Sequence, residues 1–381
     1  MISKNEFKER RNKVLNFLAD LSKEEKVNYK AVLKSGSQKT FANDVKYPFR
    51  VDSDFYYLTG FAEPDSVLVL DPHASNPYQL YVQAHDPLHA IWEGHREGLE
   101  GAKKNFDCDA AYDVDDFNEE KEPNTNKKSS STKDVLDFVH SLRTIKSNAE
   151  IALMKKSAQI SIQAHRVAQE ICTTGIYEYE LEAVLCQVFR SQGASGWAYP
   201  PIVASGANTC ILHYTENNQI IKAGDLVLID AGSEYQYYAS DITRVFAADG
   251  KMTSEQKDVY DVVLQSQLAA IESVKAGGSF AQTHDLTTAI IAEGLKNLGY
   301  IKDKNNPEEI KKYYMHGTGH SLGMDVHDCG VDKKTSVYIP GMVTTIEPGI
   351  YIRDKNIGIR IEDDVLVTKD GYEVLTQELA K

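Results

Sequence analysis

The sequence has few cysteines and no excess of positive charge. Its 381 residues include five cysteines, which are odd in number, scattered, and never arranged as Cys-x-x-Cys. This usage gives no support to a disulfide framework or a zinc finger and is typical of free thiols in a reducing cytoplasm. The formal net charge is −14. Nucleic acid is therefore not expected as a partner, because phosphate binding requires a basic surface.

Long apolar runs are also missing. No stretch approaches the roughly 18 consecutive apolar residues that indicate a membrane span, so no membrane partner is expected. The N-terminal residues predict a charged amphipathic helix, without the apolar segment of a signal peptide and too acidic to favour a transit peptide. Hydrophobic residues make up 42% and charged residues 26% of the chain. This balance predicts a soluble, cytoplasmic protein with room for two domains.

A polar segment separates two regions of the chain. Residues 119–133 read EEKEPNTNKKSSSTK and contain no apolar side chain, which is a linker composition. We assign residues 1–125 to an N-terminal domain, 126–140 to the linker and 141–381 to a C-terminal domain. A helical period over 5–20 and strand patterns at 30–34, 66–70 and 79–83 predict that the first domain is mixed α/β.

The C-terminal region repeats one order of elements. Ser147-x-x-Glu150 and Thr253-x-x-Gln256 are capping boxes that each open a pair of predicted helices. Each helix pair is followed by strands that carry two carboxylates. The pattern predicts two αβ halves related by a pseudo-twofold axis, which together donate four carboxylates to one cleft.

The stretch from Leu226 to Phe246 organises the rest of the chain. It reads LVLIDAGSEYQYYASDITRVF and predicts two paired strands with a turn at Gly232. Asp230 ends a strand that is apolar on both faces, where a carboxylate is costly unless it is paired or binds a metal. Asp241 lies eleven positions later, far enough to return and face Asp230. On these two residues alone, a structural Asp in a turn together with a surface Asp is as good an interpretation as two facing carboxylates that require positive charge between them.

Two later strands carry further acidic residues, and a nearby segment is rich in histidine. Glu347 ends the apolar strand of TTIEPGIYI, and Glu362 lies within GIRIEDDVL. The segment YMHGTGHSLGMDVHD carries His316, His320 and His327. A lone histidine is usually a satisfied core residue, but a histidine beside four buried carboxylates indicates a metal site.

These motifs resemble one family, the pita-bread metallopeptidases. The matching segments are HYTEN, IDAG with SDITR, HGTGHSLGMDVHD, EPGIYI and GIRIEDD, in the family's order and spacing. Within the family the chain is most similar to aminopeptidase P and next to prolidase, over residues 140–381. Residues 41–66, FANDVKYPFRVDSDFYYLTGFAEPDS, resemble the N-terminal domain of aminopeptidase P. The implied fold is α/β (α+β), with an N-terminal mixed α/β domain and a C-terminal pita-bread domain of pseudo-twofold αβ halves.

The resemblance implies a dinuclear metal centre. Its five ligands would be Asp230, Asp241, His320, Glu347 and Glu362. Four ionised carboxylates carry −4, which two divalent cations neutralise and one does not. The oxygen-rich ligand set favours two Mn²⁺ per subunit, although Co²⁺, Fe²⁺ or Zn²⁺ would also be accepted.

The resemblance also suggests roles for the residues around the metals. A metal-bound hydroxide would attack the peptide, and Glu347 would both bind metal and carry the proton to the leaving nitrogen. His213 and His327 would stabilise the oxyanion. The proline pocket would be formed by His316, Arg360 and Tyr351; the structural alternative for His316 is packing against His320.

The predicted enzyme is therefore an Xaa-Pro aminopeptidase that acts on peptides with proline in the second position. One alternative is a prolidase restricted to Xaa-Pro dipeptides; methionine aminopeptidases usually lack the extra N-terminal domain. Another is a catalytically inactive pita-bread binding protein, which the five matching ligand positions argue against. A homo-oligomer, dimer or tetramer, is expected because the segment around Trp92, AIWEGHREG, resembles a loop that can reach a neighbouring subunit's cleft. The alternative for Trp92 is an ordinary core position.

Overall fold

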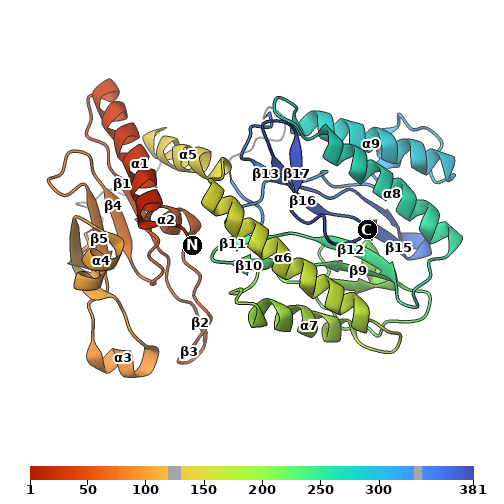
Figure 1. The fold of residues 1–381 in the computed structure, drawn as a ribbon, viewed down its shortest axis with the longest axis horizontal. Coiled ribbons are helices and arrows are strands. Elements are labelled where there is room, and N and C mark those ends of the chain that lie inside the picture. Colours follow the sequence, from red (N-terminus) through yellow and green to blue (C-terminus); the bar gives the residue numbers. More distant parts are fainter. Residues whose placement is uncertain (119–129, 330–336) are drawn as a thin grey trace. The chain divides into compact units, whose positions relative to one another are not determined.

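The computed structural model describes residues 1–118, 130–329 and 337–381. The chain forms two compact units, Met1–Arg143 and Thr144–Lys381, coloured red to yellow and yellow to blue in Figure 1. The residues from 119 to 129 in the expected linker lie outside the described residues. Among the described residues, no helix is both long enough and apolar enough to cross a membrane.

The first unit is a four-stranded sheet with helices, as the strand and helix patterns predict. The strand order is β1-β4-β5-β6, and all neighbours are antiparallel except the parallel pair β5 and β6. The elements are α1 (Lys4–Glu25), β1 (Ala31–Lys34), β2 (Thr40–Ala42), β3 (Val45–Lys46), α2 (Ser53–Thr59), β4 (Val67–Leu70), β5 (Tyr78–Val82), α3 (Pro87–Glu93), α4 (Gly98–Phe106), β6 (Ala110–Asp113) and α5 (Ser130–Thr144). Helix α1 begins where the Ser3 hydroxyl accepts a hydrogen bond from the Glu6 amide at 3.2 Å.

Helix α5 occupies much of the segment that we expected to be linker. Phe138 on this helix stacks on Phe17 with ring centroids 4.3 Å apart, and Arg143 donates to Asp54 at 2.7 Å. Residues 130–140 therefore form an ordered helix of the first unit, and the compact units meet three residues beyond the expected end of the linker. The polar composition of 119–133 did not reveal this helix, because its apolar contacts come from residues further along.

Trp92 lies on the surface of α3, so the core alternative for this residue is wrong. Its side chain is 88% exposed, and Leu88 and Ile91 on the same short helix are 73% and 77% exposed. Lys46 of the hairpin β2–β3 donates to Glu93 at the end of α3 at 2.7 Å.

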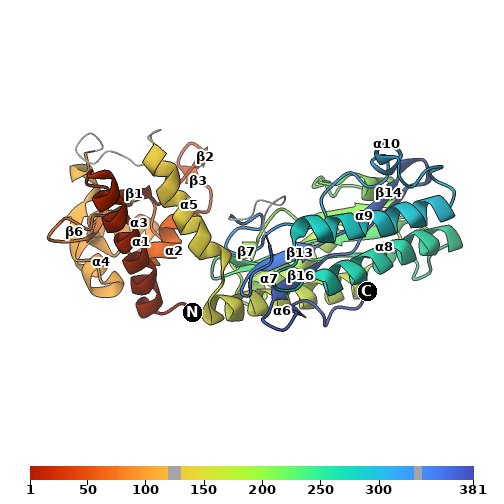
Figure 2. The ribbon, with the colours of Figure 1, turned by 90° about the horizontal axis from the view of Figure 1, so that it is seen from above.

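The second unit shows the predicted order of two helices followed by strands, twice. The first half contains α6 (Asn148–Ile171), α7 (Glu178–Ser191), β7 (Gly196–Trp197), β8 (Ile202–Ser205), β9 (Leu226–Asp230), β10 (Ser233–Tyr235), β11 (Tyr238–Ala239) and β12 (Thr243–Ala247). The second half contains α8 (Ser254–Ser273), α9 (Phe280–Asn297), α10 (Pro307–Ile310), β13 (Val343–Ile346), β14 (Gly349–Ile352), β15 (Ile357–Arg360), β16 (Asp363–Val367) and β17 (Tyr372–Val374). Both predicted capping boxes are present, at the starts of α6 and α8. Helices α8 and α9 lie side by side in Figures 1 and 2.

Strand β9 is buried on both faces, as its sequence predicts. It is the central strand of the sheet β12-β9-β8. Val227 and Ile229 pack with side chains of α6 and α7, whereas Leu226 and Leu228 pack with side chains of α8, α9, β14 and β15. Alternate residues of one strand therefore contribute to the core of each half, and Asp230 is held at the junction between them.

The predicted turn at Gly232 is wrong. Strands β9 and β12 pair antiparallel with Asp230 opposite Thr243, but a small hairpin of β10 and β11 lies between them. Its turn is at Gln236 and Tyr237, which both have positive φ. Gly232 has a different role, because a Cβ there would lie 1.7 Å from the carbonyl oxygen of Ser240. It lets two backbone segments cross closely beside the aspartates.

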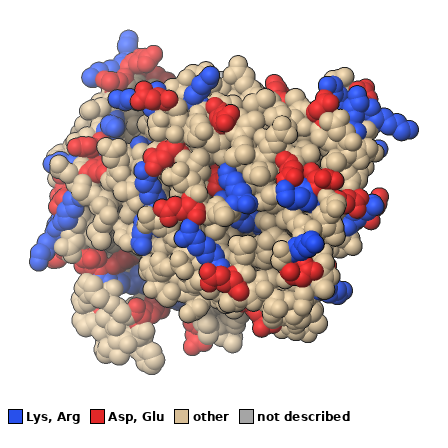
Figure 3. Space-filling view, turned by 45° about the vertical axis from the view of Figure 1, so that its right-hand side comes forward, with Lys and Arg blue, Asp and Glu red and all other residues tan. Residues whose placement is uncertain are grey.

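Charged side chains of both signs are scattered over the face shown in Figure 3. On the face shown in Figure 3, lysine and arginine are interspersed with aspartate and glutamate, and neither sign forms a continuous patch.

Candidate metal centre

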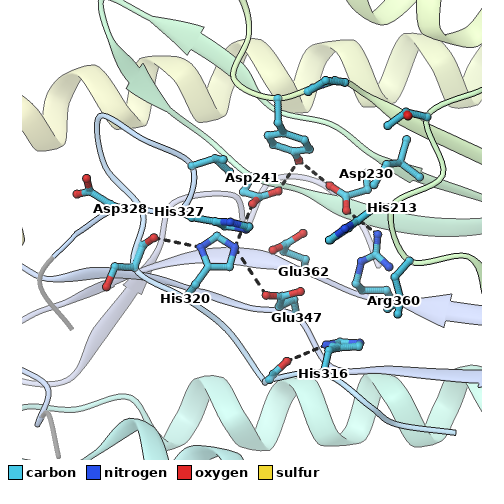
Figure 4. Close-up of a pocket in the computed structure, with 18 of the residues that line it drawn as sticks. His213, Asp230, Asp241, His316, His320, His327, Asp328, Glu347, Arg360 and Glu362 are labelled. Atoms are coloured by element: carbon cyan, nitrogen blue, oxygen red, sulfur yellow. Dashed lines mark hydrogen bonds and ion pairs between the residues drawn. The ribbon is translucent and has the colours of Figure 1, made fainter. Parts of the chain in front are cut away.

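A cavity of about 660 Å³ lies in the second unit and contains nine of the ten predicted site residues in its lining. The tenth, Tyr351, is buried behind the lining and contacts two of them, Arg360 and His316. The four predicted carboxylate ligands lie at strand ends: Asp230 ends β9, Asp241 precedes β12, Glu347 follows β13, and Glu362 lies between β15 and β16. Strands from both halves therefore deliver their carboxylates to one place (Figure 4).

Three of the five predicted ligands form a tight group. One ligand atom each from Asp241, His320 and Glu362 lie within 4.8 Å of one another. His320 Nε2 is 3.4 Å from Asp241 Oδ2 and 3.7 Å from Glu347 Oε1. The His320 Nδ1 atom donates to the Ser321 carbonyl at 3.0 Å, so Nε2 is the ring nitrogen directed at the carboxylates.

His320 and Glu347 are held side by side by backbone hydrogen bonds. The Thr345 amide donates to the His320 carbonyl at 2.9 Å, and the Glu347 amide donates to the Thr318 carbonyl at 2.7 Å. This approach requires a glycine at position 319, where a Cβ would lie 1.9 Å from the Thr345 carbonyl oxygen. The second glycine of the HGTGH motif thus places the histidine ligand against strand β13.

Asp230 faces Asp241, as predicted, and it also has a cationic partner. The Tyr199 hydroxyl contacts Oδ1 of both aspartates, at 2.6 Å from Asp230. Arg360 donates to Asp230 Oδ2 at 2.5 Å. Arg360 is 3% exposed, so it belongs to the wall of the cavity and neutralises part of the acidic charge.

The predicted pocket residues His316, Tyr351 and Arg360 form one chain of hydrogen bonds. His316 Nδ1 donates to the Gly317 carbonyl at 2.8 Å, so Nε2 accepts from the Tyr351 hydroxyl at 2.9 Å. The Tyr351 oxygen in turn accepts from Arg360 at 3.0 Å. Burial, followed by the nearby Arg360, lowers the pKa of His316 to about 4, so the ring is neutral. The alternative that His316 packs against His320 receives no support, since its ring contacts are with Tyr314 and Tyr351.

His213 and His327 line the same cavity with exposed side chains. The ring of His327 lies 4.3 Å from that of His320 in an edge-on arrangement. Figure 4 shows His213 beside Asp230 and His327 beside Asp241, so the two rings approach the acidic group from different sides.

The acidic group lacks enough positive charge to remain ionised. Burial, followed by the neighbouring carboxylates, raises the pKa of Glu362 well above its ordinary value. Burial also raises the pKa of Asp241, and it raises that of Glu347 to about 7. Burial opposes protonation of His320, but the hydrogen bond to Asp241 and the charge of Glu347 outweigh it and raise its pKa to about 9.

This donor set fits a hard divalent cation. In the state that binds a cation, with all four carboxylates ionised and the His320 ring neutral, the carboxylates carry −4 and Arg360 carries +1, which leaves −3. Carboxylate oxygens with a single imidazole are the ligands of Mn²⁺-type sites. A bound cation would replace the protons that the raised pKa values of Glu347 and Glu362 indicate.

Two residues of the site were not predicted from the sequence. Tyr199, which contacts both aspartates, lies in the segment between β7 and β8 and carries no periodic signal. Thr243 donates to Glu362 Oε2 at 2.7 Å and accepts from Arg360 Nε at 3.2 Å. Its place in SDITR, two residues after a predicted ligand, is the one signal that pointed to it.

The fold and the acidic, histidine-bearing cleft define a class of protein, the metallopeptidases. Residues 152–369 match Metallopeptidase family M24, and residues 7–132 match Aminopeptidase P, N-terminal domain. The chain belongs to metallopeptidase family M24 and has the two-domain organisation of aminopeptidase P.

Individual relatives agree with this assignment. The Xaa-Pro aminopeptidase of Haemophilus influenzae is 36% identical over 100% of this chain and 96% of its own length. The structure of the aminopeptidase PepP of Pseudomonas aeruginosa has a TM-score of 0.90 and 36% identity, covering 100% of this chain and 96% of that one. Zinc-substituted aminopeptidase P of Escherichia coli, solved in complex with product, has a TM-score of 0.88 and 33% identity, over 100% and 96% of the two chains. The predicted family and pita-bread fold are confirmed.

Proposed function

We propose that this protein is an Xaa-Pro aminopeptidase, which releases the first residue from peptides with proline second. The observation that carries the proposal is the cavity in which four carboxylates and His320 converge, in a chain whose full-length relatives bear that name. The proposed location is the cytoplasm, on the basis of five scattered cysteines with no Cys-x-x-Cys arrangement.

The proposed metal centre is dinuclear. Asp241, His320 and Glu362 would hold one cation, and Asp230 and Glu347 would complete the set for a second, with Mn²⁺ proposed for both. When bound, two divalent cations polarise the scissile carbonyl and make water more acidic. With Arg360, one cation leaves the cleft at −1 and two bring it to +1, which favours the negative charge that develops on the carbonyl oxygen.

Glu347 is proposed to carry the proton. Its carboxylate lines the cavity 3.7 Å from His320, where a water bound in the cleft would be within its reach. It would accept a proton from the attacking water and return it to the nitrogen that leaves. His327 and His213, exposed in the lining, would donate hydrogen bonds to the carbonyl oxygen.

The wall formed by His316, Tyr351 and Arg360 is proposed to receive the proline ring. Its polar atoms are already bonded to each other, so the wall offers shape instead of free donors. This suits an Xaa-Pro bond, whose nitrogen has no hydrogen to donate and whose φ is fixed. A peptidase that reads its substrate through that N–H would lose a contact here.

The test is a comparison of Gly-Pro with Gly-Pro-Ala in the presence of Mn²⁺. We expect the tripeptide to be cleaved to glycine and Pro-Ala with much the higher kcat/KM. Cleavage restricted to the dipeptide would favour a prolidase. Failure to cleave either peptide, by enzyme shown to contain metal, would favour a binding protein that kept the fold.

A homo-oligomer is proposed from the exposed apolar side chains of α3. Leu88, Ile91 and Trp92 are each more than 70% exposed, which is costly for a monomer. We expect light scattering to give a dimer or tetramer, and Trp92→Ala to shift the mass toward the monomer and raise KM. A wild-type protein that is monomeric at assay concentration contradicts this prediction.

A further inference from the structure

Hydrogen bonds of buried side chains connect the two halves of the second unit next to the acidic group. Arg244 on β12, in the first half, donates through NH1 to the Glu362 carbonyl at 2.6 Å and through NH2 to Asp363 Oδ1 at 2.8 Å, both in the second half. Its remaining hydrogen bonds are to the carbonyls of Thr243, Leu379 and Ala380, each at 3.0 Å. All five N–H donors of the Arg244 guanidinium are therefore used, and the residue is only 6% exposed.

A second connection is made by a side chain of the second half that accepts from the backbone of the first half. Both carboxylate oxygens of Asp364, in the second half, accept from the amide of Asp241, in the first half, at 3.2 Å. Asp364 is 1% exposed and also accepts a hydrogen bond from the Leu375 amide through its backbone carbonyl at 2.8 Å. The Glu362 amide donates to the Thr243 carbonyl at 3.1 Å.

These contacts act on the backbone of two proposed ligands that come from different halves. Asp241 is fixed through its amide and Glu362 through its carbonyl, while their carboxylates belong to the same group of ligand atoms within 4.8 Å. We propose that Arg244 and Asp364 are positioning residues that set the spacing between Asp241 and Glu362, and thereby the affinity of the site for divalent cations. This inference rests on the metal centre proposed above.

The competing explanation is that Arg244 only stabilises the fold. The first unit offers a matched control, because Arg11 is also buried, at 3% exposure, and donates to the Leu58 carbonyl at 2.9 Å within that unit, whereas every proposed ligand belongs to the second unit. Arg11→Met and Arg244→Met remove the same chemical group from two buried sites. Both are expected to lower Tm, but only a positioning residue changes metal affinity.

The experiment titrates Mn²⁺ into metal-stripped, full-length protein by calorimetry, well below the Tm of each variant, with circular dichroism to verify folding. We expect Kd for Mn²⁺ to rise about 10–100-fold in Arg244→Met, the range for loss of a group that supports a metal ligand, and to stay within about twofold in Arg11→Met. An unchanged Kd in Arg244→Met, beside a lower Tm, would overturn the proposal.

Two milder variants decide the matter if Arg244→Met does not fold. Arg244→Lys keeps the charge but has three donors instead of five, and Asp364→Asn keeps the shape but loses one acceptor oxygen. Each should weaken Mn²⁺ binding relative to the wild type and more than Arg11→Met does. Normal affinity in both, with normal binding by the wild type, contradicts only this inference. A wild type that binds no divalent cation contradicts the metal centre as well.

Discussion

Both units bury charged side chains, but they balance them differently. In the first unit Asp54 accepts from Arg143 at 2.7 Å and from His140 at 2.9 Å. Burial opposes the ionisation of Asp54, yet the hydrogen bonds from His140 and Arg143 outweigh it and hold its pKa below the ordinary value. In the cleft of the second unit, burial and neighbouring carboxylates instead raise the pKa of Glu362.

The comparison teaches that unbalanced charge, and not burial itself, indicates function. Even in the second unit Asp363 is balanced by Arg244 at 2.8 Å and Lys381 at 2.7 Å, and its pKa is lowered although burial opposes this. In the cavity lining, the four predicted ligand carboxylates outnumber Arg360, the arginine that pairs with Asp230. A group that the folded chain leaves uncompensated requires an external cation.

Removal of metal should have the largest effect, since it leaves this imbalance exposed. We expect a chelator to abolish peptidase activity and to lower Tm, and Mn²⁺ to restore both, because a cation that binds only the folded state stabilises it. Activity and calorimetry measure the two effects. Enzyme that is metal-free by elemental analysis and still fully active would contradict the role of the acidic group.

A variant of the balanced pair provides the control for that experiment. Asp54→Asn removes a buried charge from the first unit, where His140 and Arg143 are its partners. It should lower Tm without changing the Mn²⁺ affinity or the response to chelator. A loss of metal from this variant would mean that the two units do not differ as described.

Substitutions within the cleft should separate metal ligands from groups that act on the substrate. Glu362→Gln keeps the shape but removes a charge, so metal content should fall. His327→Ala should retain both metals and reduce kcat by about 10²–10³, the usual cost of losing one oxyanion donor. Metal stoichiometry, kcat and KM are measured together. If His327→Ala loses metal, or keeps nearly full kcat, its proposed role is wrong.

The smallest expected effect is on the pH dependence of stability. Burial raises the pKa of Glu347 from 4.5 to about 7, so between these values the metal-free folded protein binds more protons than the unfolded chain. Its contribution to stability is present below pH 4.5 and is lost as the pH rises toward 7. Mn²⁺ needs the ionised carboxylate, so the rise in Tm on adding Mn²⁺ should grow with pH. A rise that is constant from about pH 5 to pH 8 would show that Glu347 and the metal are not linked.

The sequence predicted features that depend on local pattern. The continuous run of apolar residues indicated that β9 is buried on both faces, and the spacing of Asp230 and Asp241 indicated that they face each other. It placed the turn at Gly232 because the local pattern does not distinguish a tight turn from a close backbone crossing. Tyr199 and Arg244 were not predicted as site residues, because their partners are distant in the sequence. Tyr199 contacts Asp230, 31 positions away, and Arg244 contacts Glu362, 118 positions away.

The two-sided burial of β9 has a consequence for synthesis of the chain. Helices α6 and α7 precede the strand, so the face of Val227 and Ile229 can be covered as soon as the strand is made. The face of Leu226 and Leu228 awaits partners as late as Ile359, which is 359 − 228 = 131 residues after Leu228. At about 5–20 residues per second the ribosome takes roughly 7–26 s over that interval. During this time an apolar face of the strand is open to aggregation or to a chaperone. Glu362 is added only afterwards, so the proposed cation site would be completed among the last events of maturation.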